Sequence, residues 1–281
     1  MPGVERILKE VRPDVTIGGG GFASGPVVAL AALRGIPSLA LEADAHLGVA
    51  NRLLRPFVRR ICLSFPIAGL EPPKYVLTGR PLGPAQLAAT ADEGREAFKL
   101  RADLPVVLAF GGSQGAQSIN RACIDAFGGR ELGFQLVHVC GPRNQEAVRT
   151  ALEARDERFE RYRLVPYTDR LAAAMAAADL VVARSGGSVA ELAALGKPAI
   201  LVPYPYATAD HQRKNARWMV AGGAALLVDD AELSGDLLFG LVADLLGDPR
   251  RLAAMAAASA ALGRSDATAR VVDEIEKIVK R

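Results

Sequence analysis

The 281-residue sequence has few of the residues that define several protein classes. It has only three cysteines, which is an odd number. They lie far apart in apolar surroundings, at Cys62, Cys123 and Cys140. This pattern favours reduced thiols in a core over a disulfide framework or a metal site. No stretch approaches the roughly 20 uninterrupted apolar residues of a membrane-spanning helix. The opening residues MPGVER do not resemble a signal peptide, so we expect a chain that is soluble or lies on a membrane.

The chain also lacks a strong excess of either charge. Its formal net charge is +3 and the basic residues are scattered, so composition gives no argument for a nucleic-acid partner, and we expect none. Half of the residues are hydrophobic, which excludes a disordered or fibrous protein. This length and composition allow one large domain or two ordinary ones.

Short apolar or β-branched runs alternate with longer helical patterns along the chain. Most of these runs are continuously apolar, as strands covered by helices on both faces must be. The alternation predicts parallel sheets in an α/β fold. The predicted strands are 15–17, 38–41, 61–65, 75–77, 106–110, 135–139, 163–165, 180–183, 199–202 and 225–228.

A break in this alternation falls near residues 79–91, where glycine and proline precede a polar stretch. The alternation restarts with residues 104–110, so we interpret the chain as two Rossmann-like units joined by a hinge. Helices are predicted at 252–262 and 267–280.

The stretch LAFGGSQGAQSIN (108–120) passes from a strand through a glycine turn into a helix. Backbone N–H groups around Gly111, Gly112, Ser113 and Gly115 would face an anion together with the positive end of the helix dipole. The pattern is neither GxGxxG nor a P-loop. A plain strand-to-helix turn that needs glycine explains it equally well.

A second glycine turn, GGGGFASGP (18–26), follows another predicted strand. Ser24 is expected to cap a helix that starts around Pro26. Four consecutive glycines would let the backbone approach a ligand, although a loop with a helix cap is the commoner explanation.

A third turn, ARSGGSVAELAALGKP (183–198), ends a strand at Arg184 and places Glu191 in the first turns of a helix. A carboxylate there could accept both hydroxyls of a ribose while the turn faces a phosphate. The alternative is a surface carboxylate that favours the helix dipole by about 0.3–1 kcal/mol.

A fourth segment, VPYPYATADHQRKN (202–215), delivers Asp210, His211, Gln212 and Asn215 near a helix start. Such side chains suit a sugar. A loop capped by Asp210 would also account for them.

Taken in order, these motifs resemble the MurG family of UDP-N-acetylglucosamine:lipid-linked muramyl-pentapeptide transferases. The upstream loops GGGGFASGP, LEADAHLGVANRLL and VLTGRP are similar as well, and the likeness runs from about Val11 to the C-terminus. It implies a GT-B fold, with two Rossmann-like domains, a cleft between them and a last helix that crosses back. The implied domains are an incomplete acceptor and membrane-side domain at 1–84, joined by the helix 266–281, and a UDP-sugar domain at 85–265.

The resemblance also implies the donor site. Ser113, Gln114 and the backbone of residues 111–115 would meet the diphosphate, and the backbone of Thr168 would read the uracil. Glu191 would hold the ribose, and His211 with Gln212 the sugar hydroxyls. The turn Arg184, Ser185 and Gly186 would complete the donor site, and Asn215 would support the loop.

The implied reaction is an inverting transfer of N-acetylglucosamine from UDP to the polyprenyl-linked muramyl acceptor lipid I, which forms lipid II in peptidoglycan synthesis. No DxD motif argues for a metal, and we expect neither metal nor cofactor. The enzyme would lie peripherally on the cytoplasmic face of the cell membrane.

Several departures from the family concern the catalytic side. The family opens with a GGTGGH-type loop whose histidine handles the acceptor or acts as base, and this chain begins after it. A truncated start is our expectation, with a fragment or a split enzyme as alternatives. His46, which follows Asp44, is a candidate substitute base, and Arg80 a candidate substitute cation for the family's GNPVR motif, with both Asp44 and Arg80 expected to bind substrate. ARSGGSVAE is one residue shorter than usual.

The segment 51–60 interleaves Arg52, Arg55, Arg59 and Arg60 with Leu53, Leu54, Phe57 and Val58. This amphipathic pattern suits an anionic membrane surface, and solvated arginines around a core helix explain it almost as well.

Two other functions remain open at this point. One is a different GT-B enzyme, such as a glycolipid glycosyltransferase or a UDP-sugar epimerase. The other is a non-catalytic UDP-sugar-binding fragment that needs a partner chain.

Overall fold

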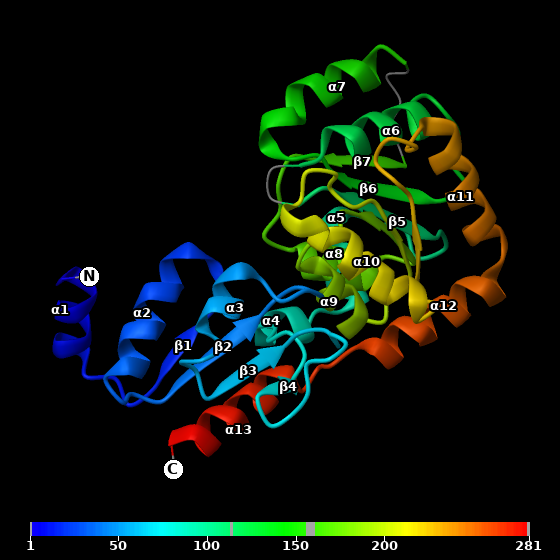
Figure 1. Ribbon diagram of the computed structural model, residues 1–281. Coiled ribbons are helices and arrows are strands. Elements are labelled where there is room, and N and C mark those ends of the chain that lie inside the picture. Colours follow the sequence, from blue (N-terminus) through cyan, green and yellow to red (C-terminus); the bar gives the residue numbers. More distant parts are fainter. Residues whose placement is uncertain (1, 113–114, 156–160, 280–281) are drawn as a thin grey trace. The chain divides into compact units, whose positions relative to one another are not determined.

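A computed structural model describes residues 2–112, 115–155 and 161–279 (Figure 1). The chain divides into two compact units. The first unit comprises Met1–Leu82 and Arg264–Arg281, and the second comprises Gly83–Gly263. The first unit therefore takes residues from both ends of the chain.

The first unit is built on a four-stranded sheet in the order β1-β2-β3-β4, and all three strand pairings are parallel. Apolar side chains from α2, β2 and β3, among them Val28, Ala40 and Ile61, form its core. The strands are β1 (Thr16–Gly18), β2 (Ser38–Glu42), β3 (Arg60–Leu63) and β4 (Tyr75–Leu77), and the helices are α1 (Pro2–Val11), α2 (Gly21–Leu33), α3 (Val49–Leu54) and α13 (Ala267–Val279).

The last helix, α13, packs on the sheet of the first unit. Val271 and Ile278 form a buried cluster with Leu39 and Cys62 of β2 and β3. Arg59 donates to the carbonyl oxygen of Ile278 at 2.6 Å, near the C-terminal end of α13. A guanidinium at that end favourably opposes the helix dipole.

The second unit holds a six-stranded sheet in the order β10-β9-β8-β5-β6-β7, also parallel at every pairing. Its strands are β5 (Val106–Phe110), β6 (Gln135–Val139), β7 (Tyr162–Val165), β8 (Leu180–Ala183), β9 (Ala199–Leu201) and β10 (Ala225–Leu227). Its helices are α4 (Pro84–Leu87), α5 (Ala91–Phe98), α6 (Gln117–Phe127), α7 (Gln145–Glu153), α8 (Leu171–Ala177), α9 (Ser188–Ala194), α10 (His211–Ala221), α11 (Gly235–Gly247) and α12 (Pro249–Leu262).

The strands β5, β6 and β8 at the centre of this sheet are buried along their whole length. Burial on both faces explains why these segments are continuously apolar. In the register, Phe110 pairs with Ala183, and Ala183 pairs with Leu201. The chain therefore leaves β5, β8 and β9 at the same edge of the sheet.

The predicted α/β class with parallel sheets is confirmed. Within the described residues, all ten predicted strands occur, with ends shifted by at most two residues. The helix expected at 267–280 is α13, with residue 280 outside the described part. The three cysteines are buried and unpaired, as the sequence predicts.

Two local predictions were wrong. The helix expected to start around Pro26 starts at Gly21, and Pro26 lies inside it. Ser24 does not cap it, because its hydroxyl donates to the carbonyl oxygen of Gly20 at 2.6 Å. Gly20, with φ of +84°, occupies the N-cap position, so the helix begins five residues before Pro26.

The basic segment 51–60 forms only part of the amphipathic surface that its sequence pattern indicates. The helix α3 ends at Leu54, which is buried with Val58, whereas Leu53 and Phe57 are 68% and 41% exposed. Arg60 pairs with the buried Glu274 at 3.4 Å. Since Arg59 also has an internal partner, two of the four arginines in the segment hold α13 in place.

None of the helices in the described part of the chain is long and apolar enough to cross a membrane.

One close helix contact yields a prediction about stability. Gly94 of α5 lies so close to α8 that a Cβ atom there would sit 2.1 Å from the carbonyl oxygen of Ala173. Gly94→Ala should destabilise the second unit by about 1–3 kcal/mol through overpacking, despite the better helix propensity of alanine. Gly240→Ala, in α11, should instead stabilise it by about 0.5–1 kcal/mol, because an added Cβ atom would have no atom outside the neighbouring helix backbone within 4 Å.

Urea denaturation followed by circular dichroism would measure both free energies of unfolding. Equal effects of the two substitutions would show that the contact between α5 and α8 does not constrain residue 94.

Candidate functional site

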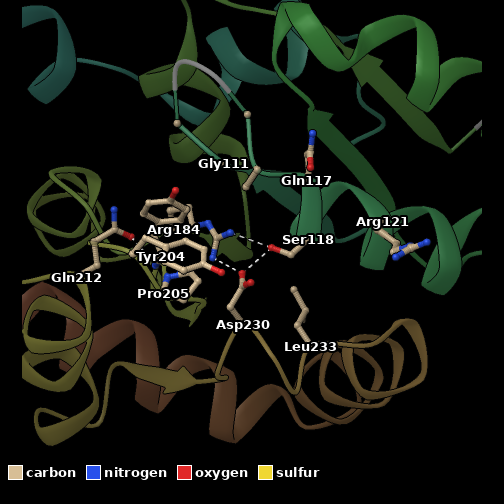
Figure 2. A pocket seen from close by; sticks show the side chains of 14 residues that line it. Gly111, Gln117, Ser118, Arg121, Arg184, Tyr204, Pro205, Gln212, Asp230 and Leu233 are labelled. Atoms are coloured by element: carbon tan, nitrogen blue, oxygen red, sulfur yellow. Dashed lines mark hydrogen bonds and ion pairs between the residues drawn. The ribbon is translucent and has the colours of Figure 1, made fainter. Parts of the chain in front are cut away.

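A pocket of about 1150 Å³ lies in the second unit, at the edge where β5, β8 and β9 end (Figure 2). Its residues come from five segments that follow strands or begin helices. They are Gly111, Gly112, Gly115, Ala116, Gln117, Ser118, Arg121, Arg184, Tyr204, Pro205, Tyr206, Gln212, Asp230 and Leu233. The carboxyl edge of a parallel sheet is where such folds bind ligands.

In the glycine turn that follows β5, two positions leave no room for a side chain. A Cβ atom on Gly111 would lie 2.2 Å from the backbone nitrogen of Ala116, and one on Gly115 would lie 2.0 Å from the carbonyl oxygen of Cys140. Gly112 and Gly115 also have φ of +86° and +75°, which favours glycine. The turn thus brings backbone close to the pocket at the start of α6. Ser113 and Gln114 lie outside the described residues.

Arg184 is held in the pocket by several partners, two of which are drawn in Figure 2. Its Nη1 pairs with a carboxylate oxygen of Asp230 at 2.5 Å, and its Nη2 donates to the hydroxyl of Ser118 at 2.8 Å. Ser118 in turn donates to Asp230 at 2.6 Å. Nη1 also donates to the backbone oxygens of Val202 and Pro203, both at 3.1 Å.

This network ties together the ends of β8, β9 and β10 and the first turn of α6. Sequence reasoning identified Arg184 but missed Ser118 and Asp230. The one available signal was that Asp230 follows a predicted strand at the same edge of the sheet.

Aromatic side chains form part of the pocket wall. Tyr204 and Tyr206 meet edge to face with ring centroids 5.6 Å apart, and Tyr206 is 82% exposed. The guanidinium of Arg184 lies 5.5 Å from the ring centroid of Tyr204, which is a cation–π contact. The pocket therefore combines a polar floor with an aromatic wall.

The segment after β9 contributes Gln212, whose side-chain oxygen accepts from the backbone nitrogen of Tyr204 at 2.9 Å. His211 contacts the carbonyl oxygen of Thr208 through Nδ1 at 2.8 Å. Asn215 is buried and donates to the carbonyl oxygen of Ser185 at 3.1 Å, so it supports the neighbouring turn. Asp210 occupies the N-cap position of α10 without a capping hydrogen bond, and pairs instead with Arg213 at 3.4 Å.

The turn after β8 places Ser185 in the interior, with its hydroxyl lacking a hydrogen-bond partner among the described residues. A Cβ atom on Gly186 would lie 3.8 Å from the side-chain nitrogen of Gln212, so this turn borders the pocket. Glu191 is half-buried in the first turn of α9, and Thr168 accepts from the backbone nitrogen of Arg170 at 3.0 Å. Neither belongs to the described lining of the pocket.

Asp44, His46 and Arg80 belong to the first unit. Arg80 reaches the carbonyl oxygen of Ala43 at 3.5 Å, so it contacts the loop that carries the other two. The buried Glu42 fixes this loop by accepting from the backbone nitrogen of Gly48 at 2.8 Å. No group of three or more potential metal ligands occurs among the described residues.

The Arg184 network yields a second prediction. Asp230→Ala should destabilise the second unit by about 3 kcal/mol, because it leaves a guanidinium that is 11% exposed without its carboxylate. The control is the adjacent Asp229→Ala, which breaks a more exposed pair with Arg213 and should cost at most about 1 kcal/mol.

Thermal and urea unfolding would provide the two values, and a cycle with Arg184→Met would isolate the coupling between Arg184 and Asp230. Equal losses for Asp229→Ala and Asp230→Ala would contradict the central place of this pair.

The sequence matches the glycosyltransferase family 28 C-terminal domain over residues 106–271, more than half of the chain. It is 40% identical to the UDP-N-acetylglucosamine--N-acetylmuramyl-(pentapeptide) pyrophosphoryl-undecaprenol N-acetylglucosamine transferase of Halothermothrix orenii, with 98% of this chain and 77% of that protein covered. The same transferase of Moorella thermoacetica is 42% identical, with 97% and 76% covered.

Among solved structures, MurG of Acinetobacter baumannii matches with a TM-score of 0.78 and 28% identity, covering 98% of this chain and 76% of that one. A UDP complex of MnaA from S. aureus matches with a TM-score of 0.71 at 16% identity, which supports the fold alone. The GT-B fold that the sequence predicts is therefore confirmed. On these grounds the chain belongs to the MurG family of glycosyltransferases.

Proposed function

We propose that this chain transfers N-acetylglucosamine from UDP-N-acetylglucosamine to the muramyl sugar of lipid I, forming lipid II for peptidoglycan. The observation that carries the proposal is the pocket of the second unit, in which a glycine turn and a helix start meet hydrogen-bonding side chains at the carboxyl edge of a parallel sheet. High identity to transferases of this specificity over nearly the whole chain supports the choice of substrates.

In this proposal the glycine turn and the first turn of α6 bind the diphosphate of UDP. Unpaired backbone N–H groups and the helix dipole favour an anion at that point. Arg184 is neutralised by Asp230, so among the described lining residues the positive charge for the diphosphate would come from Arg121, which is exposed on α6. Ser113 and Gln114 remain proposed contacts from the family pattern.

The remaining donor contacts are proposed by position in the family pattern. Glu191 would accept hydrogen bonds from the ribose hydroxyls, and the backbone of Thr168 would read the uracil. Gln212 and His211 would meet the sugar, and the aromatic wall of Tyr204 and Tyr206 would pack against its apolar face.

The reaction is then a displacement with inversion at the anomeric carbon. The acceptor hydroxyl oxygen forms the new bond to that carbon, the bond from carbon to phosphate oxygen breaks, and the hydroxyl proton passes to a base. Negative charge grows on the departing diphosphate, so donors fixed around the turn stabilise the transition state more than the substrate. His46 is the candidate base in the described chain, with Asp44 and Arg80 as proposed substrate contacts.

We also propose that the enzyme docks on the cytoplasmic face of the cell membrane through the α3 surface. We define this surface by Val49, Arg52, Leu53, Arg55 and Phe57, which are all exposed. Apolar side chains among arginines favour the boundary of an anionic bilayer, where a polyprenyl-linked acceptor is found.

The donor proposal predicts that UDP binds in the presence of EDTA, because backbone donors and Arg121 supply the positive field. Glu191→Ala should weaken UDP binding at least tenfold, since the ribose hydroxyls lose their acceptor. Glu131→Ala, which removes an exposed carboxylate elsewhere in the second unit, should leave the affinity unchanged. Isothermal titration calorimetry would measure all three.

A transfer assay with lipid I would then separate the candidate functions. Formation of lipid II supports the proposal, acceptor-independent change of the sugar would indicate an epimerase, and UDP binding without any reaction would indicate a binding fragment. Failure of UDP to bind at all would contradict every one of these functions.

The membrane proposal predicts that Leu53→Asp together with Phe57→Asp reduces sedimentation with anionic vesicles at least tenfold, because burial of both side chains is lost. Val272→Asp, at a 45% exposed position on α13, should have no effect. Binding that depends neither on anionic lipid nor on the α3 surface would contradict docking through this surface.

A further inference from the structure

A chain of buried hydrogen bonds runs through the second unit next to the glycine turn. His138 on β6 is fully buried, and its Nδ1 lies 2.7 Å from the hydroxyl of Tyr162 on β7. Its Nε2 lies 2.9 Å from the side-chain oxygen of Asn120 on α6. The side-chain nitrogen of Asn120 donates to the carbonyl oxygen of Cys140 at 2.9 Å. All four residues are at most 5% exposed.

The direction of these hydrogen bonds follows from the carbonyl end. A carbonyl oxygen can only accept, so the amide nitrogen of Asn120 must face Cys140, and the amide oxygen must face His138. That oxygen also only accepts, so Nε2 of His138 must carry a proton. If the imidazole is neutral, Nδ1 is bare and accepts from the hydroxyl of Tyr162. With a neutral imidazole, this is the only arrangement in which His138 bonds to both Asn120 and Tyr162.

The surroundings keep the imidazole neutral. Burial lowers the pKa of His138 to about 3, far below neutral pH. Burial also raises the pKa values of Tyr162, Cys123 and Cys140, so these neighbours stay uncharged.

The network ends on the atom against which the glycine turn is packed. The carbonyl oxygen of Cys140 accepts from Asn144 at 3.0 Å as well as from Asn120, which lies in the first turn of α6. Gly115 touches the same oxygen so closely that it leaves no space for a Cβ atom. One carbonyl thus fixes both the end of the turn and the beginning of the helix.

We propose that His138 is a positioning residue for the diphosphate: its Nε2–H holds Asn120 against Cys140 and thereby sets the turn and the first backbone donors of α6. This inference rests on the proposed function, because a diphosphate is bound at the turn only if the chain uses a UDP-sugar donor. His138 itself does not touch that donor. A site that stabilises charge with fixed dipoles depends on such alignment.

The first test is spectroscopic and uses the unmodified chain, which contains only three histidines. A ¹⁵N-histidine correlation spectrum between pH 6 and 8 should show one imidazole that does not titrate and carries its proton on Nε2. His138→Gln should remove this signal and so assign it. A proton on Nδ1, or titration in this range, would overturn the inference.

The second test separates positioning from general destabilisation by measuring UDP affinity in calorimetry. His138→Leu should weaken UDP binding at least tenfold, because Asn120 loses its donor. His138→Gln should remain within about threefold of the wild type, since its amide can donate to the same oxygen. Tyr162→Phe, which removes the bond on the side of the imidazole away from the turn, should also remain within about threefold.

Unchanged UDP affinity in His138→Leu, or an equal loss in Tyr162→Phe, would overturn the positioning role. The absence of UDP binding by the wild type would instead contradict the proposed function, and the positioning role with it, so the two failures are distinguishable. If His138→Leu does not fold, a proton on Nδ1 in the spectrum, or a loss of UDP affinity in His138→Gln beyond about threefold, would still overturn the inference.

Discussion

Parallel strands cannot be joined by a tight turn, and this constraint creates the pocket of the second unit. After β5, β8 and β9 the chain must leave the same edge of the sheet and cross over before it can pair again. Gly111, Arg184 and the segment around Tyr204 therefore converge, although they are far apart in the sequence. The buried strands β5, β8 and β9 behind these segments maintain the position of each exit.

The same arrangement determines which positive groups of the pocket remain for an anionic ligand. Its central guanidinium is already neutralised by Asp230 and serves to hold strand ends together. In the proposed donor site, oriented backbone donors and the exposed Arg121 would meet the diphosphate. Fixed dipoles of this kind need no rearrangement as charge moves during a reaction, but they act only when the backbone N–H groups are held in the right orientation. The buried polar network around His138 maintains that orientation.

The sequence predicted the sheets well because burial on both faces leaves an unmistakable trace, as in the continuously apolar segment Val106–Phe110. The need for glycine after β5 was also predictable, since a strand that turns directly into a helix requires positive φ angles, as at Gly112 and Gly115. The contacts of Asp230, Ser118 and Tyr162 were missed, because their partners lie in distant segments of the chain. The helix start at Gly21 was misjudged for a related reason. Serine and proline are common at helix starts, which favoured a start near Pro26. The helix starts at Gly21 instead, because Gly20, with its positive φ, occupies the N-cap position.

The discontinuous first unit has a consequence for the order of events at the ribosome. Its core includes Val271 and Ile278 of α13, whereas the second unit is one continuous segment that is complete at Gly263. During synthesis the second unit can therefore finish folding while the sheet of the first unit still exposes Leu39 and Cys62. These side chains are covered only when α13 has been synthesised and packs on the sheet, so the first unit reaches its final packing after the second.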